Sequence, residues 1–264
     1  ITCQATASRE FINCVVSVQP RSAGGDGGDA GSAGVIADLA HRLPPLIDTA
    51  SHHPETYRVT EQGAMVSLGT VCRQEIDKYN ALLTHLGSAL KKLQKAMRGE
   101  VVMDRGLERM SESIGFVQVP AAWAKEAYPS LKGLSAWFAD LVARVDFFRD
   151  WNDGGTPQSF WVGGFFFPQG FLTGVLQTHA RQFAVPIDTL KFSARVTSDT
   201  DPDLADLELL QSGVYIHGLH LEGARWDVAA SALADQLPRE QFSAMPVIHL
   251  KAVMAESVAG KGHY

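Results

Sequence analysis

The chain has 264 residues, of which 45% are hydrophobic and 20% are charged, and its formal net charge is −6. This length allows one large or two small domains with a substantial core, and the balance of apolar and charged residues is typical of a globular protein. Neither a basic stripe nor an apolar run of about 18 residues, the minimum for a membrane span, occurs, so we expect neither nucleic acid nor a membrane as a partner.

The first 34 residues are predicted to hold little regular structure. Residues 1–20 indicate a strand end followed by a short helix, and because the chain begins at Ile1 rather than at methionine, we expect a cut inside a longer chain. Residues 21–34, RSAGGDGGDAGSAG, predict a flexible Gly-rich loop. Residues 25–30 fit a loose G-x-G-x-x-A pattern, but no good strand precedes them, so we discount nucleotide binding there.

Residues 35–151 are predicted to form a helical subdomain. Apolar residues recur every three or four positions between Thr60 and Gly99, which predicts a helix of about 35 residues with those two residues as its caps. We interpret it as a core helix, although the spacing also suits a coiled coil. Other helices are predicted over 35–51, with a break at Pro44 and Pro45, and over 103–116, 121–128 and 131–151, and the break NDGGTP predicts a linker at 152–158.

Residues 159–264 are predicted to form a small antiparallel β-barrel-like subdomain with one helix. Single strands are expected at 159–164, 187–196 and 246–253, two strands are expected within 213–230, and the helix is expected to begin at Pro168. Closing or nearly closing the sheet would hide its edges. The fold class predicted for the whole chain is therefore α+β.

The stretch GGFFFP lies between the first expected strand and this helix. The glycine pair lets the backbone turn or approach another segment closely, and each phenylalanine would bury about 150–250 Å². We interpret it as a hydrophobic structural joint between a helical layer and the sheet, in preference to a ligand pocket. The residues of this joint are Gly163, Gly164, Phe165, Phe166, Phe167 and Pro168.

A second group of residues surrounds a predicted hairpin-like turn at Glu222 and Gly223. Arg225 and Asp227 stand close to Glu222 in the sequence, and an ion pair that fixes the turn is a better interpretation than an acid–base couple. Trp226 follows the turn in a strand that must bury one face, so we expect its ring to be in the core.

The sequence contains no motif of known catalytic chemistry. The phosphate loop and the H-E-x-x-H and G-x-S-x-G motifs are all absent, so no catalytic, cofactor-binding or metal-binding residue is predicted. His52, His53 and Glu55 could ligate a metal, but they adjoin a proline in an expected loop. His217 and His220 lie three residues apart in extended chain and would face opposite sides; His249 lies in another strand.

Four stretches, in this order and spacing, closely resemble the C-terminal region of dynein heavy chains. They are WAKEAYPSLKGLSAWFADLVAR (123–144), FWVGGFFFPQGFLTGVLQTHAR (160–181), GVYIHGLHLEGARWD (213–227) and AMPVIHLKAV (244–253). The resemblance covers about residues 35–253, and residues 1–20 resemble the end of the sixth AAA+ module. The forms GARWD and MPVI are most similar to axonemal dyneins of the outer-arm beta class.

The resemblance implies a helical subdomain and a small β-barrel that lie against the AAA+ ring of a microtubule motor. It implies a non-catalytic regulatory role in the cytoplasm of a cilium or flagellum, in the axoneme, with ATP and Mg bound only by upstream modules and no cofactor in this chain. The implied partners are the AAA+ modules of the same heavy chain and, through the parent, microtubules and other dynein subunits. Residues 163–183 would then seat the barrel on the helical layer.

Two other functions stay open from the residues alone. One is a stand-alone enzyme or small-ligand-binding barrel, built from residues 159–264. The other is a helical scaffold that binds a partner through the long helix at 60–98.

Overall fold

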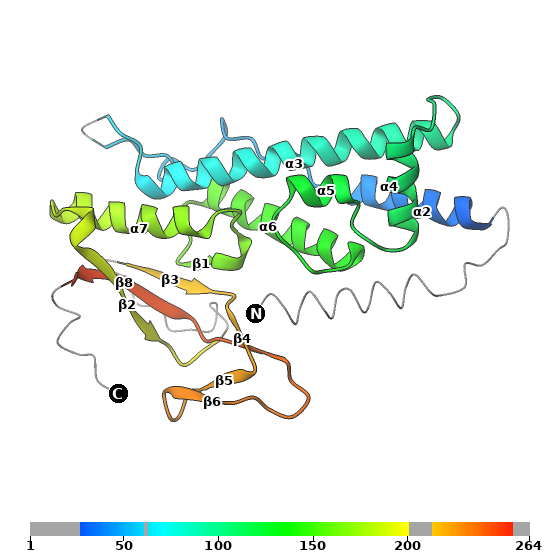
Figure 1. Cartoon of the computed structure of the whole chain (residues 1–264). Helices are drawn as coiled ribbons and strands as arrows, with labels where there is room; N and C mark the ends of the chain where they lie inside the picture. The colour runs from blue at the N-terminus through cyan, green and yellow to red at the C-terminus, as the bar shows by residue number, and fades with distance from the viewer. Residues whose placement is uncertain (1–26, 61–62, 201–212, 256–264) are drawn as a thin grey trace. The chain divides into compact units, whose positions relative to one another are not determined.

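The computed structural model describes residues 27–60, 63–200 and 213–255, which form helices and short strands (Figure 1). The chain divides into two compact units, one made of residues 1–46 and 80–143 and the other of residues 47–79 and 144–264. Two helices contribute residues to both units. The division expected at 152–158 instead falls inside the second unit.

The helices expected from periodicity are present, but some limits differ clearly: the helix expected over 35–51 runs over Gly27–Arg42 instead. The long helix begins at Ser67 rather than Thr60, because Thr60 belongs to a turn in which its Oγ1 accepts a hydrogen bond from the N–H of Ala64 at 3.3 Å. It ends as predicted before Gly99, whose φ is +75°. The described helices are α2 (Gly27–Arg42), α3 (Ser67–Met97), α4 (Arg105–Gly115), α5 (Ala121–Glu126), α6 (Leu134–Gly154) and α7 (Pro168–Phe183).

Helix α2 begins inside the Gly-rich stretch. Residues 27–34, predicted as loop, are its first two turns, and residues 21–26 lie outside the described part of the molecule. Glycine is a poor helix former, but Ile36 and Leu39 are buried in the first unit and anchor the helix from its packed face. Tertiary packing therefore outweighs local propensity here.

The core of the first unit is aromatic and aliphatic. Trp137 lies between Trp123 and Tyr128, with ring centroids 6.2 and 6.1 Å apart, and all three side chains are buried. Leucines on one face of α3 complete this core; they are Leu82, Leu83, Leu86, Leu90 and Leu93. The apolar stripe of the sequence thus marks a core helix, as predicted.

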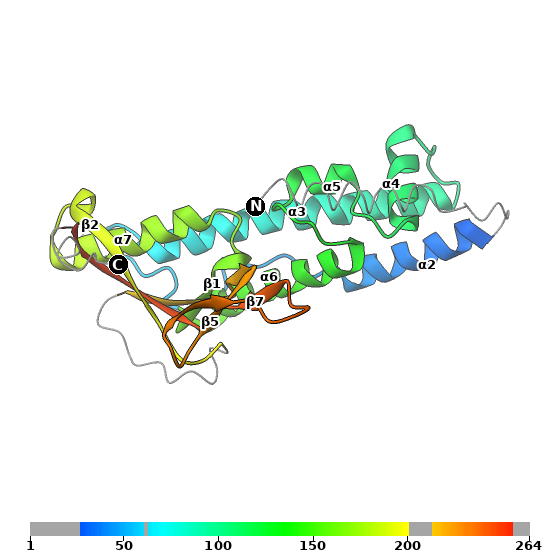
Figure 2. The ribbon, with the colours of Figure 1, turned by 60° about the horizontal axis from the view of Figure 1, so that its bottom comes forward.

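The strands of the second unit form a mixed sheet and two ribbons. The four-stranded sheet has the order β1-β3-β8-β2, in which β1 is parallel to β3 and the other neighbours are antiparallel. Two antiparallel ribbons, β4–β7 and β5–β6, lie next to each other (Figure 2). The strands are β1 (Ser159–Trp161), β2 (Leu190–Val196), β3 (Val214–His217), β4 (His220–Glu222), β5 (Ala224–Asp227), β6 (Ala232–Asp235), β7 (Phe242–Ala244) and β8 (Ile248–Met254).

This arrangement shows the α+β class, and it differs from the prediction in the direction of β1 and in the turn at Glu222 and Gly223. The sheet is not wholly antiparallel, and among the described strands no sheet closes on itself, so the barrel-like form is not confirmed. The hairpin expected at Glu222 and Gly223 is absent from the pairing, because β4 pairs with β7 and β5 pairs with β6. Gly223, with φ +72°, bends the backbone between two strands that have different partners.

Within the described residues, no helix is both long enough and apolar enough to cross a membrane.

Candidate functional site

The predicted joint connects β1 to α7 in the second unit. A short 3-10 turn (Val162–Gly164) leads into the phenylalanines, and Pro168 takes the first position of α7 as expected. Only Phe165 is buried, with 3% of its surface exposed, whereas Phe166 is half-buried and Phe167 is 52% exposed. The expectation that all three rings would be buried is therefore wrong for Phe167.

Phe165 packs in an aromatic cluster built from three elements. Its ring centroid lies 5.2 Å from that of Phe148 on α6 and 4.7 Å from that of Phe171 on α7. Phe160 on β1 lies 5.0 Å from Trp151 on α6 and 4.8 Å from Phe171. The cluster ties the end of α6, β1 and α7 into one core inside the second unit, which is compatible with the predicted joint.

The glycines of the joint permit a close approach by Trp161. A Cβ added at either Gly163 or Gly164 would lie 3.0 Å from the indole of Trp161, closer than side chains normally approach. The guanidinium of Arg144 lies 5.3 Å from the centre of the same ring, on its face, as in a cation–π contact. A side chain at either glycine would therefore press against Trp161, which is compatible with the close approach expected from the sequence.

Two side chains of α3, one helical turn apart, hold the joint through its backbone. The carboxylate of Glu75 accepts hydrogen bonds from the N–H of Phe166 at 2.6 Å and of Phe167 at 3.1 Å. The hydroxyl of Tyr79 donates to the carbonyl oxygen of Gly164 at 2.5 Å. These bonds satisfy backbone groups that the sheet and α7 leave unpaired.

Glu75 is a buried acid, with only 3% of its surface exposed. Burial raises its pKa, while the two backbone N–H groups and the charges of Lys78 and Arg144 act in the opposite direction. The Lys78 ammonium lies 5.8 and 5.7 Å from the ring centres of Phe166 and Phe167. Sequence reasoning missed Glu75, although a lone acid between the buried residues of an apolar helix face was a signal that could have found it.

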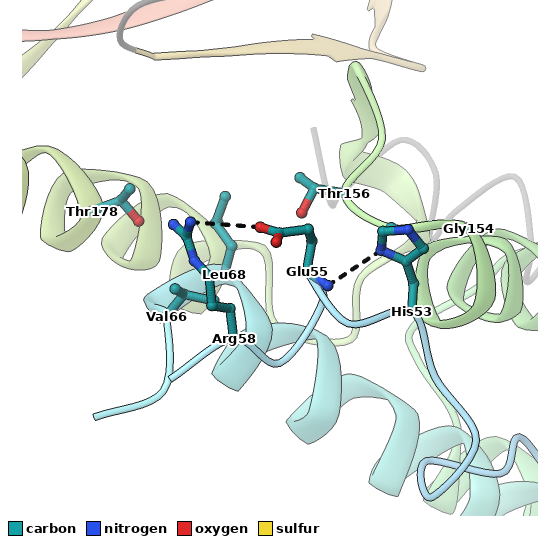
Figure 3. Close-up of a pocket in the computed structure, with 9 residues that line it drawn as sticks. His53, Glu55, Arg58, Val66, Leu68, Gly154, Thr156 and Thr178 are labelled. Atoms are coloured by element: carbon teal, nitrogen blue, oxygen red, sulfur yellow. Dashed lines mark hydrogen bonds and ion pairs between the residues drawn. The ribbon is translucent and has the colours of Figure 1, made fainter. Parts of the chain in front are cut away.

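A cavity of about 420 Å³ lies elsewhere in the second unit, between the loop at 53–58, the start of α3, the end of α6 and α7 (Figure 3). Arg58 lies 3.6 Å from the carboxylate of Glu55, and the N–H of Glu55 donates to Nδ1 of His53 at 3.2 Å. The side chains of Glu55 and Arg58 are more than 60% exposed. The cavity is therefore an open surface hollow with both charge signs.

The structure places the histidines considered as metal ligands in separate surroundings. Nδ1 of His53 accepts the Glu55 hydrogen bond just described, and the ring of His52 lies 4.8 Å from that of Tyr57. His217 bonds through Nδ1 to Ser159 Oγ at 2.8 Å, and His249 lies beside Tyr215 on the neighbouring strand. His220 is exposed on β4. In the described ranges no three His, Cys, Asp or Glu residues gather as metal ligands would.

The residues around the predicted turn are only partly brought together. Arg225 and Asp227 form the expected ion pair at 3.2 Å. Asp227 also accepts the N–H of Ala230, and that bond, with the charge of Arg225, lowers the pKa of Asp227. Glu222 lies on another ribbon, with only a marginal contact to Gln241 at 3.5 Å.

Trp226 is half-buried and is not part of the core, contrary to the expectation. The physical reason is that β5 belongs to a two-stranded ribbon instead of the four-stranded sheet, so no second layer of described residues covers its ring fully.

The chain is similar to known proteins along most of its length. The family described as the C-terminal domain of dynein heavy chains matches residues 5–264. The chain is 43% identical over 237 residues to dynein axonemal heavy chain 12 of Homo sapiens, covering 87% of this chain and 7% of that protein. It is 40% identical over 245 residues to human dynein axonemal heavy chain 1, covering 91% and 6%. With the mouse heavy chain 1 the identity is 38% over 259 residues, covering 96% and 6%.

The chain therefore belongs to the family of dynein C-terminal domains, as its motifs indicated. It spans about 6–7% of the length of these curated relatives. The beta class expected from GARWD and MPVI is not confirmed by these matches and stays a prediction.

Proposed function

We propose that this chain is the non-catalytic, regulatory C-terminal domain of an axonemal dynein heavy chain, a microtubule motor of cilia and flagella. The observation that carries the proposal is the family match over residues 5–264, in relatives that are many times longer and are named axonemal dynein heavy chains. A domain that makes up a small part of a large motor is suited to adjusting the motions of that motor.

The partners follow from the same proposal. The domain packs on the AAA+ modules of its own heavy chain, and it meets microtubules and other dynein subunits only through the parent. ATP and Mg are bound by upstream modules, and this chain holds no cofactor. We place the protein in the cytoplasm of the cilium or flagellum, in the axoneme.

The joint supports a mechanical role for the second unit. Glu75, Tyr79 and the cluster around Phe165 tie α3, α6, α7 and β1 together, which favours motion as one stiff body. A stiff body that bridges moving modules raises the free energy of some arrangements and lowers that of others. A bias of about 1–2 kcal/mol changes a conformational equilibrium about 5- to 30-fold. We also propose that the strands of this unit complete a barrel-like form in the parent.

The test compares the full motor with a version that ends before α2. A cut at Asp153, the boundary expected from the sequence, would separate Phe148 and Trp151 from Phe160 and Phe165 and expose half of an aromatic core. A motor that ends at residue 26 avoids this damage. We expect it to keep ATPase activity while its velocity, run length or force changes in gliding and single-molecule assays.

Two results would contradict the proposal. Unchanged motility and unchanged stimulation by microtubules would remove the regulatory role, and complete loss of ATPase activity in an intact ring would make the domain part of the catalytic machinery. The alternative of a stand-alone enzyme or ligand-binding domain is tested by calorimetry with ATP. We expect that a protein of these 264 residues does not bind ATP with micromolar affinity.

A further inference from the structure

The ribbon β5–β6 and the loop that follows it expose large apolar side chains. Leu233 on β6 is 66% exposed, and Phe242 at the start of β7 is 54% exposed. Val228 and Leu237, in the two connections of the ribbon, are also exposed. These four side chains come from 15 consecutive positions, 228–242.

The pairing register separates the two faces of this ribbon. Trp226 stands directly opposite Leu233, so the two side chains lie on the same face. Arg225 stands opposite Ala234 and Asp227 opposite Ala232, which puts the Arg225–Asp227 ion pair on the other face. Ala224 stands opposite Asp235, two residues along each strand from Trp226 and Leu233, so Asp235 lies on their face. The ribbon thus has one face with Trp226, Leu233 and the acid Asp235, called here the Trp226–Leu233 face, and one face with the ion pair.

A ribbon of this kind is poorly stabilised by itself. It has two strands of four residues, and a two-stranded ribbon in water is marginally stable at best without a layer that covers its apolar face. Contiguous exposed apolar side chains mark interaction sites on soluble proteins. The Trp226–Leu233 face therefore has the properties of a surface that a partner covers.

The charges around this face indicate the chemistry of that partner. Arg225 is already paired with Asp227. The other charged residues of the segment 218–244 are the acids Glu222, Asp235 and Glu240 and the single base Arg239. An apolar surface with an acidic surround is complementary to an apolar segment flanked by Lys or Arg.

We propose that the Trp226–Leu233 face binds a segment of the parent heavy chain that lies outside these 264 residues and carries apolar side chains flanked by Lys or Arg. More than nine-tenths of the length of the curated relatives lies outside the part that this chain matches, so ample sequence is present to supply the segment. The inference rests on the proposed function, because it takes the occupant from the same motor.

The test is photo-crosslinking in the complete parent heavy chain. The photoreactive residue p-benzoylphenylalanine replaces Leu233 in one variant and Ala232 in the matched control, which is exposed on the opposite face of the same strand. The crosslinked peptides are identified by mass spectrometry. We expect position 233, and not position 232, to crosslink to a peptide outside these 264 residues that has both apolar residues and at least two Lys or Arg.

A charge variant sharpens the test. Asp235→Lys reverses the acid that shares this face with Leu233 and should lower the crosslink yield from position 233 about 3- to 10-fold, while Asp188→Lys, an exposed acid before β2, should leave it unchanged. Both variants keep Trp226 and Leu233, so a loss of yield reports on charge complementarity.

Four outcomes would overturn the inference. They are equal yields from positions 232 and 233, a crosslink from 233 to residues of these same 264, a crosslink to a second copy or another subunit, and equal yields in the two charge variants. None of these depends on motility, so the inference can fail while the regulatory role stands. A truncated motor with unchanged motility would instead refute the regulatory role and would have no bearing on the crosslinking result.

Discussion

The aromatic joint and the β5–β6 ribbon belong to the same compact unit, yet they are stabilised in different ways. At the joint, Phe165 is enclosed by side chains from α6 and α7. On the ribbon, Leu233 faces Trp226 but lies mostly in solvent. Large apolar side chains are present in both regions, and the difference is whether a further layer of the same molecule covers them. Burial, rather than composition, decides how much each region stabilises the fold.

The polar groups of the two regions also differ in how deeply they are buried and in how many hydrogen bonds hold them. The carboxylate of Glu75 is buried and accepts two backbone N–H groups, so its removal would leave unsatisfied donors in the interior. The Arg225–Asp227 pair of the ribbon is about one-third exposed, and such pairs are worth only about 0–1 kcal/mol. The joint is held by interactions inside the molecule, while the ribbon has few of them.

The largest expected effect is the difference in stability loss when one apolar side chain of each region is replaced by alanine. Phe165→Ala should lower the free energy of unfolding by about 3–5 kcal/mol, because it leaves a cavity in a closed aromatic cluster. Leu233→Ala, the matched change on the ribbon, should cost less than about 0.5 kcal/mol. Urea melts of the two variants measure both values. Equal costs would show that the two regions do not differ as described.

The next effect concerns the buried acid. Glu75→Ala should cost about 2–4 kcal/mol, because the N–H groups of Phe166 and Phe167 lose their acceptor in the interior. Glu75→Gln keeps one carbonyl acceptor in the same shape and should cost about 1 kcal/mol. A chemical denaturation series supplies both numbers. If the alanine variant proves as stable as the glutamine variant, the carboxylate does not hold the joint.

Trp226 gives a smaller, intermediate effect. Since its ring is half-buried on a ribbon, Trp226→Ala should cost about 1–2 kcal/mol in the 264 residues, less than the truncation of a core tryptophan. Trp151→Ala, in the core of the same unit, is the control and should cost about 3–5 kcal/mol. Comparable losses for the two tryptophans would place Trp226 in the core after all.

The smallest effect is a pH dependence of the joint. Burial raises the pKa of Glu75 above its ordinary value of 4.5, so folding favours the protonated acid. That contribution is complete below the ordinary value and is lost as pH rises through the raised pKa. The free energy of unfolding of the wild type should therefore fall relative to Glu75→Gln as pH rises above about 4.5. A wild type that gains stability over this variant in that range would contradict the assignment.

The helices could be predicted closely because their signal is repeated. The apolar stripe of α3 and the turn at Gly99 recur in the structure, and Pro168 starts α7 where its missing N–H costs nothing. Ends were predicted less well, because a single residue such as Thr60 can cap a turn as readily as a helix. Strong periodicity fixes the existence of an element, and local hydrogen bonds fix its limits.

The ribbons and the contacts of the joint could not be predicted in the same way. Strands β6 and β7 are only four and three residues long and contain small residues, so they carry no clear alternation. The role of Glu75 depends on N–H groups about 90 residues further along the sequence, and no local pattern encodes that distance. The glycine pair was singled out because two adjacent glycines by themselves indicate a turn or a close approach of the backbone. In the structure, Trp161 lies close to both glycines.

The most direct test of the central comparison is amide hydrogen exchange of the 264 residues alone and within the complete parent heavy chain. We predict that the amides of Phe165 and Phe171, at the joint, are equally protected in both. Those of Trp226 and Leu233, in the ribbon, should exchange about tenfold or more slowly in the parent, because the proposed partner segment is present only there. Equal protection of the ribbon in both, or loss of the joint's protection in the isolated 264 residues, would contradict the account.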